Sequence, residues 1–218
     1  MMKKRDFIKL SASATVGVAA LVAAPVGAAR ISGLLTKKED ASTIRRRNRF
    51  PNVPLLTHEG KLVKFYDDLI KDKIVLINFM YVRCGEICPG MTANLRRVQE
   101  EFGDRMGKDV FMYSVSLDQD TPEMLKGYAE LFNVQPGWTF LTGKKADIEI
   151  LRNQLGFNSS DPKIDKDRTQ HTGVVKFGIE QRETWAMAPA LSEPKFIAEY
   201  LRWMEPRGKR PGLETMAG

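Results

Sequence analysis

Residues 74–89 read IVLINFMYVRCGEICP, and the rest of the chain is organised around them. Residues 74–80 are almost entirely apolar, which is typical of a central strand covered on both faces. The polar turn that follows carries Cys84 and Cys88, the two cysteines of the chain, and Pro89 suits the first turn of a helix. The stretch therefore predicts a buried strand, a turn with both thiols, and a helix that begins beside them.

Strand-like and helix-like segments alternate along the remainder of the chain. Apolar runs predict strands, and apolar residues at helical spacing predict amphipathic helices. The expected elements are a hairpin over 55–65, a helical turn over 66–70, strands over 110–117 and 138–143, a closing hairpin over 171–187, and helices over 89–102, 124–132, 148–155 and 196–204. Residues 158–170 are polar and without period, and are expected to form a loop. This order predicts an α/β fold, a three-layer α/β/α sandwich with a mixed central sheet and an N-terminal hairpin extension.

The positive charge of the chain is concentrated near its N-terminus. The formal net charge is +7, to which residues 1–29 contribute +3, residues 30–49 contribute +5 and residues 50–218 contribute −1. Because the part expected to fold is close to neutral, a nucleic-acid partner is not expected. The cysteine count excludes a scaffold of several disulfides, but leaves a single disulfide, a redox dithiol or a metal site open.

The first residues have the pattern of an export signal. Lys3, Lys4 and Arg5 precede a weakly apolar run over residues 10–29 that ends in small side chains. The letters KRDFIK at residues 4–9 resemble a twin-arginine export motif with lysine in place of the first arginine. The run is also long enough to stay as a membrane tether, so cleavage and retention both remain open. Either outcome puts the domain in the periplasm or on the outer face of the cytoplasmic membrane.

The chain is accordingly divided into four parts. Residues 1–29 are the export signal or anchor, and residues 30–52 are a basic flexible linker without hydrophobic period. Residues 53–205 form the folded domain. Residues 206–218 are polar and are expected to be a disordered tail.

Cys84 and Cys88 offer two soft sulfur donors beside the expected helix N-terminus. Thiolates select Cu(I) and Zn(II), and the partial positive charge of a helix N-terminus stabilises them. His171 begins a later strand, and strand ends and helix starts meet at one edge of such a sheet. Zinc prefers four ligands, or three and a water, and no fourth residue is evident, so the set fits three-coordinate copper better.

Other interpretations of these residues stay open. A structural disulfide between residues i and i+4 closes too small a loop to stabilise the fold by more than about 2 kcal/mol. Thiol–disulfide exchange usually employs two intervening residues, whereas three leave room for an ion between the sulfurs. His171 alone could be a plain strand-end histidine. His58 lies beside the first hairpin turn and is interpreted as an exposed turn residue and not as a ligand.

Several motifs taken together resemble those of the Sco/SenC family of thioredoxin-fold copper proteins. They are FYDDL at 65–69, INFMY at 77–81, CGEICP at 84–89, SLDQDTP at 116–122, GWTFLTG at 137–143, and His171 before the last hairpin. A cysteine pair alone would not be specific, but this set occurs in the family's order across roughly residues 53–203.

The resemblance implies a thioredoxin-like fold and one copper ion per chain, Cu(I) or Cu(II), bound by Cys84, Cys88 and His171. It implies delivery of copper to the binuclear centre of cytochrome c oxidase or to a related copper enzyme, with a second copper chaperone as a further partner. Asp118 or Asp120 corresponds to an acidic residue near the metal, or serves as a helix cap. Such a protein is a metal carrier and not an enzyme.

The alternative is a thiol–disulfide oxidoreductase that reduces the cysteines of a copper-site client with its own cysteine pair. The chain has no proline near Gly173, where thioredoxin-type oxidoreductases place one, and this argues against general disulfide reduction. Two departures from the family pattern concern the metal site. Gly85 replaces a frequent proline, and Gln170 replaces the aspartate before the histidine, which weakens orientation of the imidazole.

Overall fold

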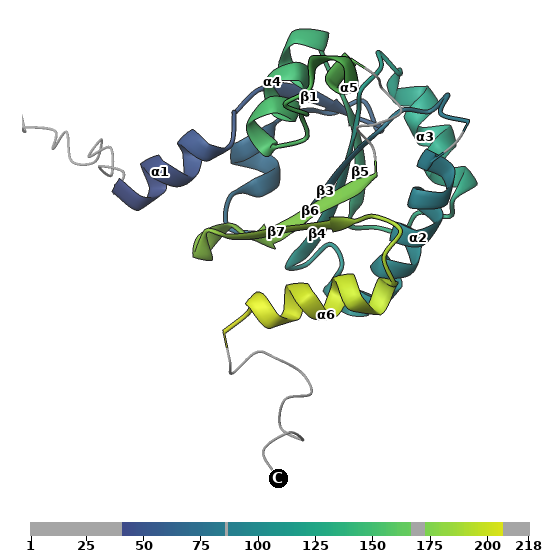
Figure 1. Cartoon of the computed structure of the whole chain (residues 1–218). Coiled ribbons are helices and arrows are strands. Elements are labelled where there is room, and N and C mark those ends of the chain that lie inside the picture. Colours follow the sequence, from purple (N-terminus) through teal and green to yellow (C-terminus); the bar gives the residue numbers. More distant parts are fainter. Residues whose placement is uncertain (1–40, 86, 167–172, 207–218) are drawn as a thin grey trace, which may run out of the picture. The chain divides into compact units, whose positions relative to one another are not determined.

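The computed structural model describes residues 41–85, 87–166 and 173–206 (Figure 1). Their elements, in chain order, are α1 (Ala41–Arg49), β1 (Pro54–Thr57), β2 (Leu62–Lys64), the π-helical turn η1 (Phe65–Ile70), β3 (Ile74–Met80), α2 (Ile87–Phe102), the short 3₁₀ turn η2 (Gly103–Arg105), β4 (Val110–Ser116), α3 (Pro122–Leu131), β5 (Trp138–Thr142), α4 (Lys145–Leu155), α5 (Pro162–Lys166), β6 (Val174–Ile179), the 3₁₀ turn η4 (Glu180–Arg182), β7 (Thr184–Pro189) and α6 (Pro194–Met204).

The described strands form one mixed sheet in the order β2-β1-β5-β4-β3-β6-β7. Strand β3 lies near its centre, parallel to β4 and antiparallel to β6. In this register Ile74, the first residue of β3, lies between Val110 and Ile179. The prediction of a central strand that leads into the cysteine turn is confirmed.

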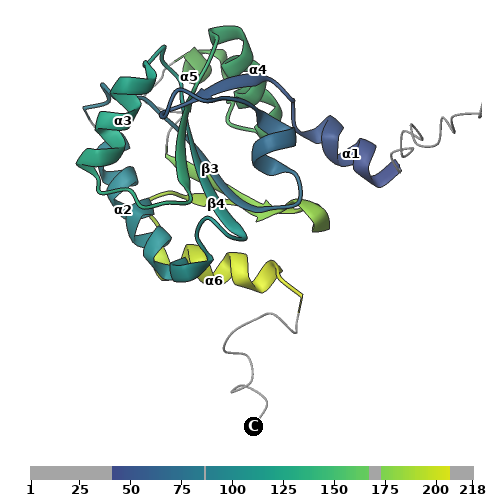
Figure 2. The same cartoon turned by 180° about the vertical axis from the view of Figure 1, so that it is seen from behind.

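The side chains of β3 point alternately to two cores, as the two-residue period of a strand requires. Leu76 and Met80 belong to a cluster with α2, α3 and α6, whereas Val75, Ile77 and Phe79 belong to a cluster with η1 and α4. Figures 1 and 2 show α2 and α6 on one face of the sheet and α4 on the other. This arrangement confirms the predicted three-layer α/β/α sandwich.

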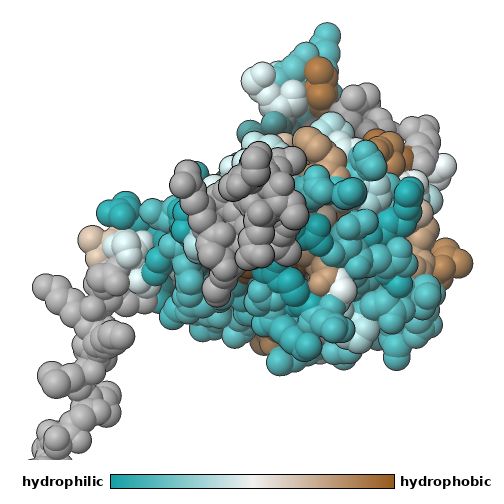
Figure 3. All heavy atoms as spheres, turned by 90° about the horizontal axis from the view of Figure 1, so that it is seen from below, coloured by the Kyte–Doolittle hydropathy of each residue, from teal (hydrophilic) through white to brown (hydrophobic). Residues whose placement is uncertain are grey.

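The described surface seen from below is largely hydrophilic, and hydrophobic residues appear there as separate spots (Figure 3). Within residues 41–85, 87–166 and 173–206, no helix combines the length and the apolar character needed to cross a membrane.

The N-terminal hairpin extends the sheet, as expected. Strand β1 pairs with β2 and, through Leu56 and Thr57, with β5. His58 is not merely an exposed turn residue: it is half-buried, and its backbone N–H donates to the Phe140 carbonyl at 2.9 Å. Its Nδ1 accepts the Phe140 N–H at 3.1 Å. The imidazole therefore fastens the hairpin turn to β5.

Residues 41–50 differ from the flexible linker expected up to residue 52. Residues 41–49 form helix α1, and Phe50 behind it is only 1% exposed. The Phe50 ring lies 4.7 Å from that of Trp185, and Arg46 Nε lies 3.1 Å from Glu180 Oε1. Helix α1 has no buried residue of its own. It is held by partners more than 130 positions away, and local periodicity could not reveal it.

A short helix, α5, interrupts the loop expected over residues 158–170. Pro162 begins it, and the Asp161 carboxylate accepts the Lys163 N–H at 2.8 Å, which caps the first turn. Asp165 is held by Arg152 of α4 at 2.7 Å. A five-residue helix gains little from propensity, so this ion pair with α4 is what stabilises it.

Candidate metal centre

Both cysteines lie where β3 ends and α2 begins. Cys84 is in the turn after Met80, and Cys88 is in the first turn of α2. Both are buried, at 6% and 0% exposure, and no disulfide joins them. The first N–H groups of a helix have no partner within it. Here the Cys88 N–H donates to Cys84 Sγ at 3.4 Å, so a sulfur stands where an oxygen usually caps a helix.

The sulfurs are surrounded by apolar side chains. Cys84 and Cys88 belong to the same buried cluster as Met80, Met91 and Leu95. Such surroundings exclude water and strengthen electrostatic interactions of any charge held there. A thiolate at this place therefore needs a hydrogen-bond donor or a cation nearby.

Two tyrosine hydroxyls lie near the cysteine pair. The hydrogen bond between the Tyr81 hydroxyl and Cys84, followed by burial and the negative charges of Cys84, Cys88 and Asp118, raises the pKa of Tyr81 to about 12. Burial is the main cause that raises the pKa of Tyr128 to about 12, with the thiolate charges adding to it. The Tyr128 hydroxyl lies 3.0 Å from that of Thr92. Sequence reasoning gave Tyr81 no role, although it stands three residues before Cys84.

Asp120 fixes the backbone of the cysteine turn. It is 4% exposed, and its Oδ2 accepts the Val82 N–H at 3.0 Å and the Ser116 hydroxyl at 2.7 Å. The cap of α3 is Thr121, whose side chain accepts the Met124 N–H at 3.3 Å. Asp120 is therefore a support of the turn and not the helix cap, and Asp118 is half-buried beside it.

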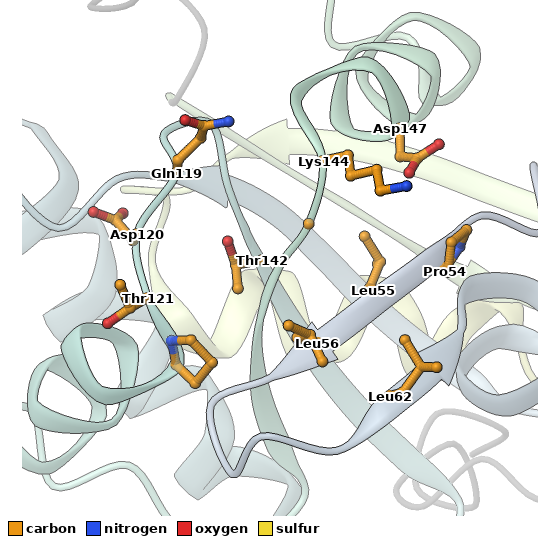
Figure 4. A pocket seen from close by; sticks show the side chains of 12 residues that line it. Pro54, Leu55, Leu56, Leu62, Gln119, Asp120, Thr121, Thr142, Lys144 and Asp147 are labelled. Carbon is orange, nitrogen blue, oxygen red and sulfur yellow. The ribbon is translucent and has the colours of Figure 1, made fainter.

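A cavity of about 550 Å³ lies on the other side of the Asp120 loop (Figure 4). It is lined by residues 54–56, Leu62, 119–122, 142–144 and Asp147. The view shows the Asp120 carboxylate directed away from Leu56 and Leu62. Residues 119–122 thus separate this mainly apolar hollow from the cysteine turn.

The third predicted ligand, His171, lies outside the described residues. Within the part of the chain that the structure describes, no three His, Cys, Asp or Glu side chains gather to hold a metal ion. The nearest described residue is Gly173, which lies against the start of α2: a Cβ built on it would come 3.5 Å from Ile87 Cδ1. Arg83, next to Cys84 in the chain, is exposed.

Solved structures resemble this arrangement of sheet and helices. A SCO1/SenC family lipoprotein from Bacillus anthracis str. Ames superposes with a TM-score of 0.59, at 23% identity over 71% of this chain and 94% of that chain. Bradyrhizobium japonicum ScoI with copper bound gives a TM-score of 0.55, at 25% identity over 71% of this chain and 99% of that chain. These similarities confirm the predicted thioredoxin-like α/β fold.

Sequence comparison leads to the same group of proteins. The SCO1 protein homolog of Bacillus subtilis (strain 168) is 30% identical over 94 residues, which are 42% of this chain and 48% of that relative. The matched part thus spans about half the length of that relative. The SCO1/SenC family model matches residues 49–205. Because this match covers well over half of the sequence and includes both cysteines, the chain belongs to the SCO1/SenC family.

Proposed function

We propose that the protein is an extracytoplasmic copper metallochaperone. It holds one copper ion per chain, Cu(I) or Cu(II), at Cys84, Cys88 and His171. It delivers the ion to the binuclear centre of cytochrome c oxidase or to a related copper enzyme. The observation that carries the proposal is the buried, reduced cysteine pair in a single turn of an SCO1/SenC domain. The copper-bound state of the Bradyrhizobium relative supports it.

The chemistry of the turn suits a soft cation. Two thiolates in apolar surroundings repel each other until a cation neutralises their charge. Cu(I) is a soft ion that thiolates select. The Cys88 N–H that points at Cys84 Sγ lowers the cost of negative charge on that sulfur. An ion bound here therefore replaces a repulsion by two strong bonds.

His171 is proposed as the third ligand because Gly173, two residues after it in the chain, lies near the cysteine turn. Gly173 lies beside Ile87, the residue before Cys88. Two residues of extended chain span at most about 7 Å, so the chain length allows the His171 imidazole to reach the start of α2. An imidazole completes the low coordination number that copper accepts.

The ion would leave on the Cys84 side. Cys84 retains 6% exposure while Cys88 has none. Gly85 next to it is exposed, and a Cβ there would meet nothing within 4 Å. A client's ligand approaching from this open side reaches Cys84 first, so transfer proceeds by exchange of that sulfur while Cys88 still holds the ion.

The test is an anaerobic Cu(I) titration of the reduced full chain against a competing chelator. The wild type is expected to bind one equivalent, Cys84→Ser and Cys88→Ser each to lose more than about 100-fold in affinity, and His171→Ala to lose at least about 10-fold. His58→Ala is the matched control, since His58 is engaged with Phe140. Equal Cu(I) affinities of the His171 and His58 variants would show that His171 is not a copper ligand.

The second candidate is a thiol–disulfide oxidoreductase, which the Cys88 N–H bond to Cys84 Sγ also favours. In it the Cys84 thiolate attacks a client disulfide and releases one client thiolate. Cys88 then attacks the mixed disulfide, releases the second client thiolate and leaves a Cys84–Cys88 disulfide. The variant His171→Ala distinguishes the two functions. Reduction of a client disulfide would be unchanged in it, whereas copper retention would be weaker.

We infer an extracytoplasmic location from the export pattern of residues 1–29. The Bacillus anthracis relative is a lipoprotein. Cell fractionation with and without residues 1–29 tests this location, and recovery of both forms from the cytoplasm would contradict it.

A further inference from the structure

An aromatic surface runs along α6 to the start of β7, which lies at the end of the sheet opposite to the cysteine turn. Phe196, Tyr200 and Trp203 stand at i, i+4 and i+7 on α6, and are 51%, 47% and 58% exposed. With Trp185 of β7 they line a hollow of about 610 Å³ between α6 and this edge strand. We call these four residues the aromatic face. Large aromatic side chains are costly to leave in water, so a run of three on one helix indicates a partner.

A basic helix adjoins the aromatic face. The Trp185 ring contacts Phe50, the residue after α1, at 4.7 Å, and Arg45 of α1 lies 3.9 Å from Glu183 beside β7. Helix α1 carries four arginines and no acidic residue, and three of those arginines are exposed. In both views of the ribbon, α1, the start of β7 and the end of α6 lie on the same side (Figures 1 and 2).

The sequence before α1 indicates which partner the aromatic face and α1 bind. Eleven residues, 30–40, separate α1 from the apolar run that ends at Ala29, and they include Arg30, Lys37 and Lys38. Fully extended, they span at most about 40 Å. An apolar run held in a bilayer therefore keeps α1 within about 40 Å of the lipid surface, where arginine is attracted to anionic headgroups.

We propose that the aromatic face and α1 together rest on an anionic lipid bilayer. Tryptophan and tyrosine favour the headgroup region, and the arginines of α1 supply the attraction. On α6 itself Lys195 and Arg202 outnumber Glu199, which lies 3.9 Å from Lys195. Helix α6 therefore presents no net negative charge to the membrane.

This orientation directs the cysteine turn away from the membrane. Thr184 of β7 pairs with Ile179, and Ile179 pairs with Ile74 at the start of β3. Cys84 follows the other end of that strand. Seven residues of strand rise by about 20 Å, so the cysteine turn faces the compartment and stays open to a client while the opposite end is on lipid.

The proposal is tested with the full chain reconstituted in vesicles that contain lipids with brominated acyl chains, which quench nearby tryptophan. Trp185 and Trp203 are the reporters, since Trp138 is buried in the core at 3% exposure. Vesicles with one-quarter phosphatidylglycerol should quench the emission by at least about one-third, and vesicles of phosphatidylcholine alone should quench it much less. Raising the salt to about 0.5 M should reverse the difference, because screening weakens the attraction of the arginines.

Variants assign the effect to the surface. Arg45→Gln with Arg49→Gln, and separately Phe196→Ser, should at least halve the quenching while flotation with the vesicles is unchanged. Arg97→Gln with Lys126→Gln, exposed on α2 and α3, is the matched control and should leave it intact. Quenching that is equal in all three proteins, or absent from anionic vesicles, would overturn the proposal. So would concentration-dependent dimerisation without quenching, which would make the aromatic face a contact with a second copy.

Discussion

Asp120 and Val82 form the link that holds the cysteine turn to the rest of the sheet: the aspartate carboxylate accepts the valine N–H at 3.0 Å. The same oxygen accepts the Ser116 hydroxyl at 2.7 Å, and Asp120 is 4% exposed. Asp120→Ala leaves the part-buried Val82 N–H and the buried Ser116 hydroxyl without this acceptor. We expect a loss of about 2–4 kcal/mol in the free energy of unfolding, measured by urea denaturation.

Asp104→Ala is the control for this loss, because Asp104 is exposed in the turn η2. It should change stability by no more than about 0.5 kcal/mol. Asp120→Asn keeps an acceptor oxygen and should fall between the two. If Asp120→Ala were as stable as the control, Asp120 would not support the turn.

Tyr81 should report the redox state of the cysteine pair. Its pKa is raised to about 12 first of all by the hydrogen bond with Cys84. Oxidation to a Cys84–Cys88 disulfide removes the thiolate acceptor and its charge. The pKa of Tyr81 should then fall toward the ordinary value of about 10.

The measurement is an absorbance titration of tyrosinate in the reduced and oxidised proteins. Tyr81→Phe should lose the difference between the two states, whereas Tyr200→Phe, an exposed residue on α6, should keep it. A difference that persists in Tyr81→Phe would assign it to another tyrosine.

The sequence was sufficient wherever neighbouring residues determine the structure. The apolar run Ile74–Met80 predicted the central strand, and apolar residues at helical spacing over 124–132 predicted most of α3. It was insufficient where the partner is distant. Helix α1 depends on Glu180 and Trp185, and the dual hydrogen bonds of His58 with Phe140 depend on strand order.

The candidate site divides along the same line. The spacing of Cys84 and Cys88 was enough to propose them as a candidate pair, because a single turn brings residues four positions apart together. The support from Asp120 follows from the parallel pairing of β3 with β4, which sets Met80 beside Ser116, whereas the hydrogen bond between Tyr81 and Cys84 is local to the turn. His171 lies outside the described residues and stays a prediction from the sequence.

Phe50 tests whether the folded domain begins before residue 53. It is 1% exposed and packs on Trp185 at 4.7 Å. Phe50→Ala should destabilise the protein by about 3–5 kcal/mol, the usual cost of removing a buried phenylalanine. Chemical denaturation measures the loss, and Ile44→Ala on α1, where Ile44 is 45% exposed, is the control. Similar stability of the two variants would indicate that residues 41–50 belong to the linker and not to the folded domain.

Tyr66 predicts a loss of stability in strong alkali. Its hydroxyl donates to Glu180 Oε1 at 2.8 Å, and burial followed by Glu180 raises the pKa of Tyr66 to about 12. The unfolded chain releases this proton at its ordinary pKa of about 10. Between pH 10 and 12 the folded state therefore holds more protons than the unfolded state, and stability contributed by Tyr66 below pH 10 is lost as pH rises through this range.

Replacing Tyr66 by phenylalanine separates this contribution from that of other buried tyrosines. Tyr66→Phe removes a hydrogen bond to a charged group and should cost about 1.5–3 kcal/mol at pH 7. Its stability should then fall less steeply from pH 10 to 12 than that of the wild type, so the two curves converge in alkali. Urea denaturation at each pH measures both curves. Parallel curves across the range would show that Tyr66 ionises alike in the folded and unfolded chain.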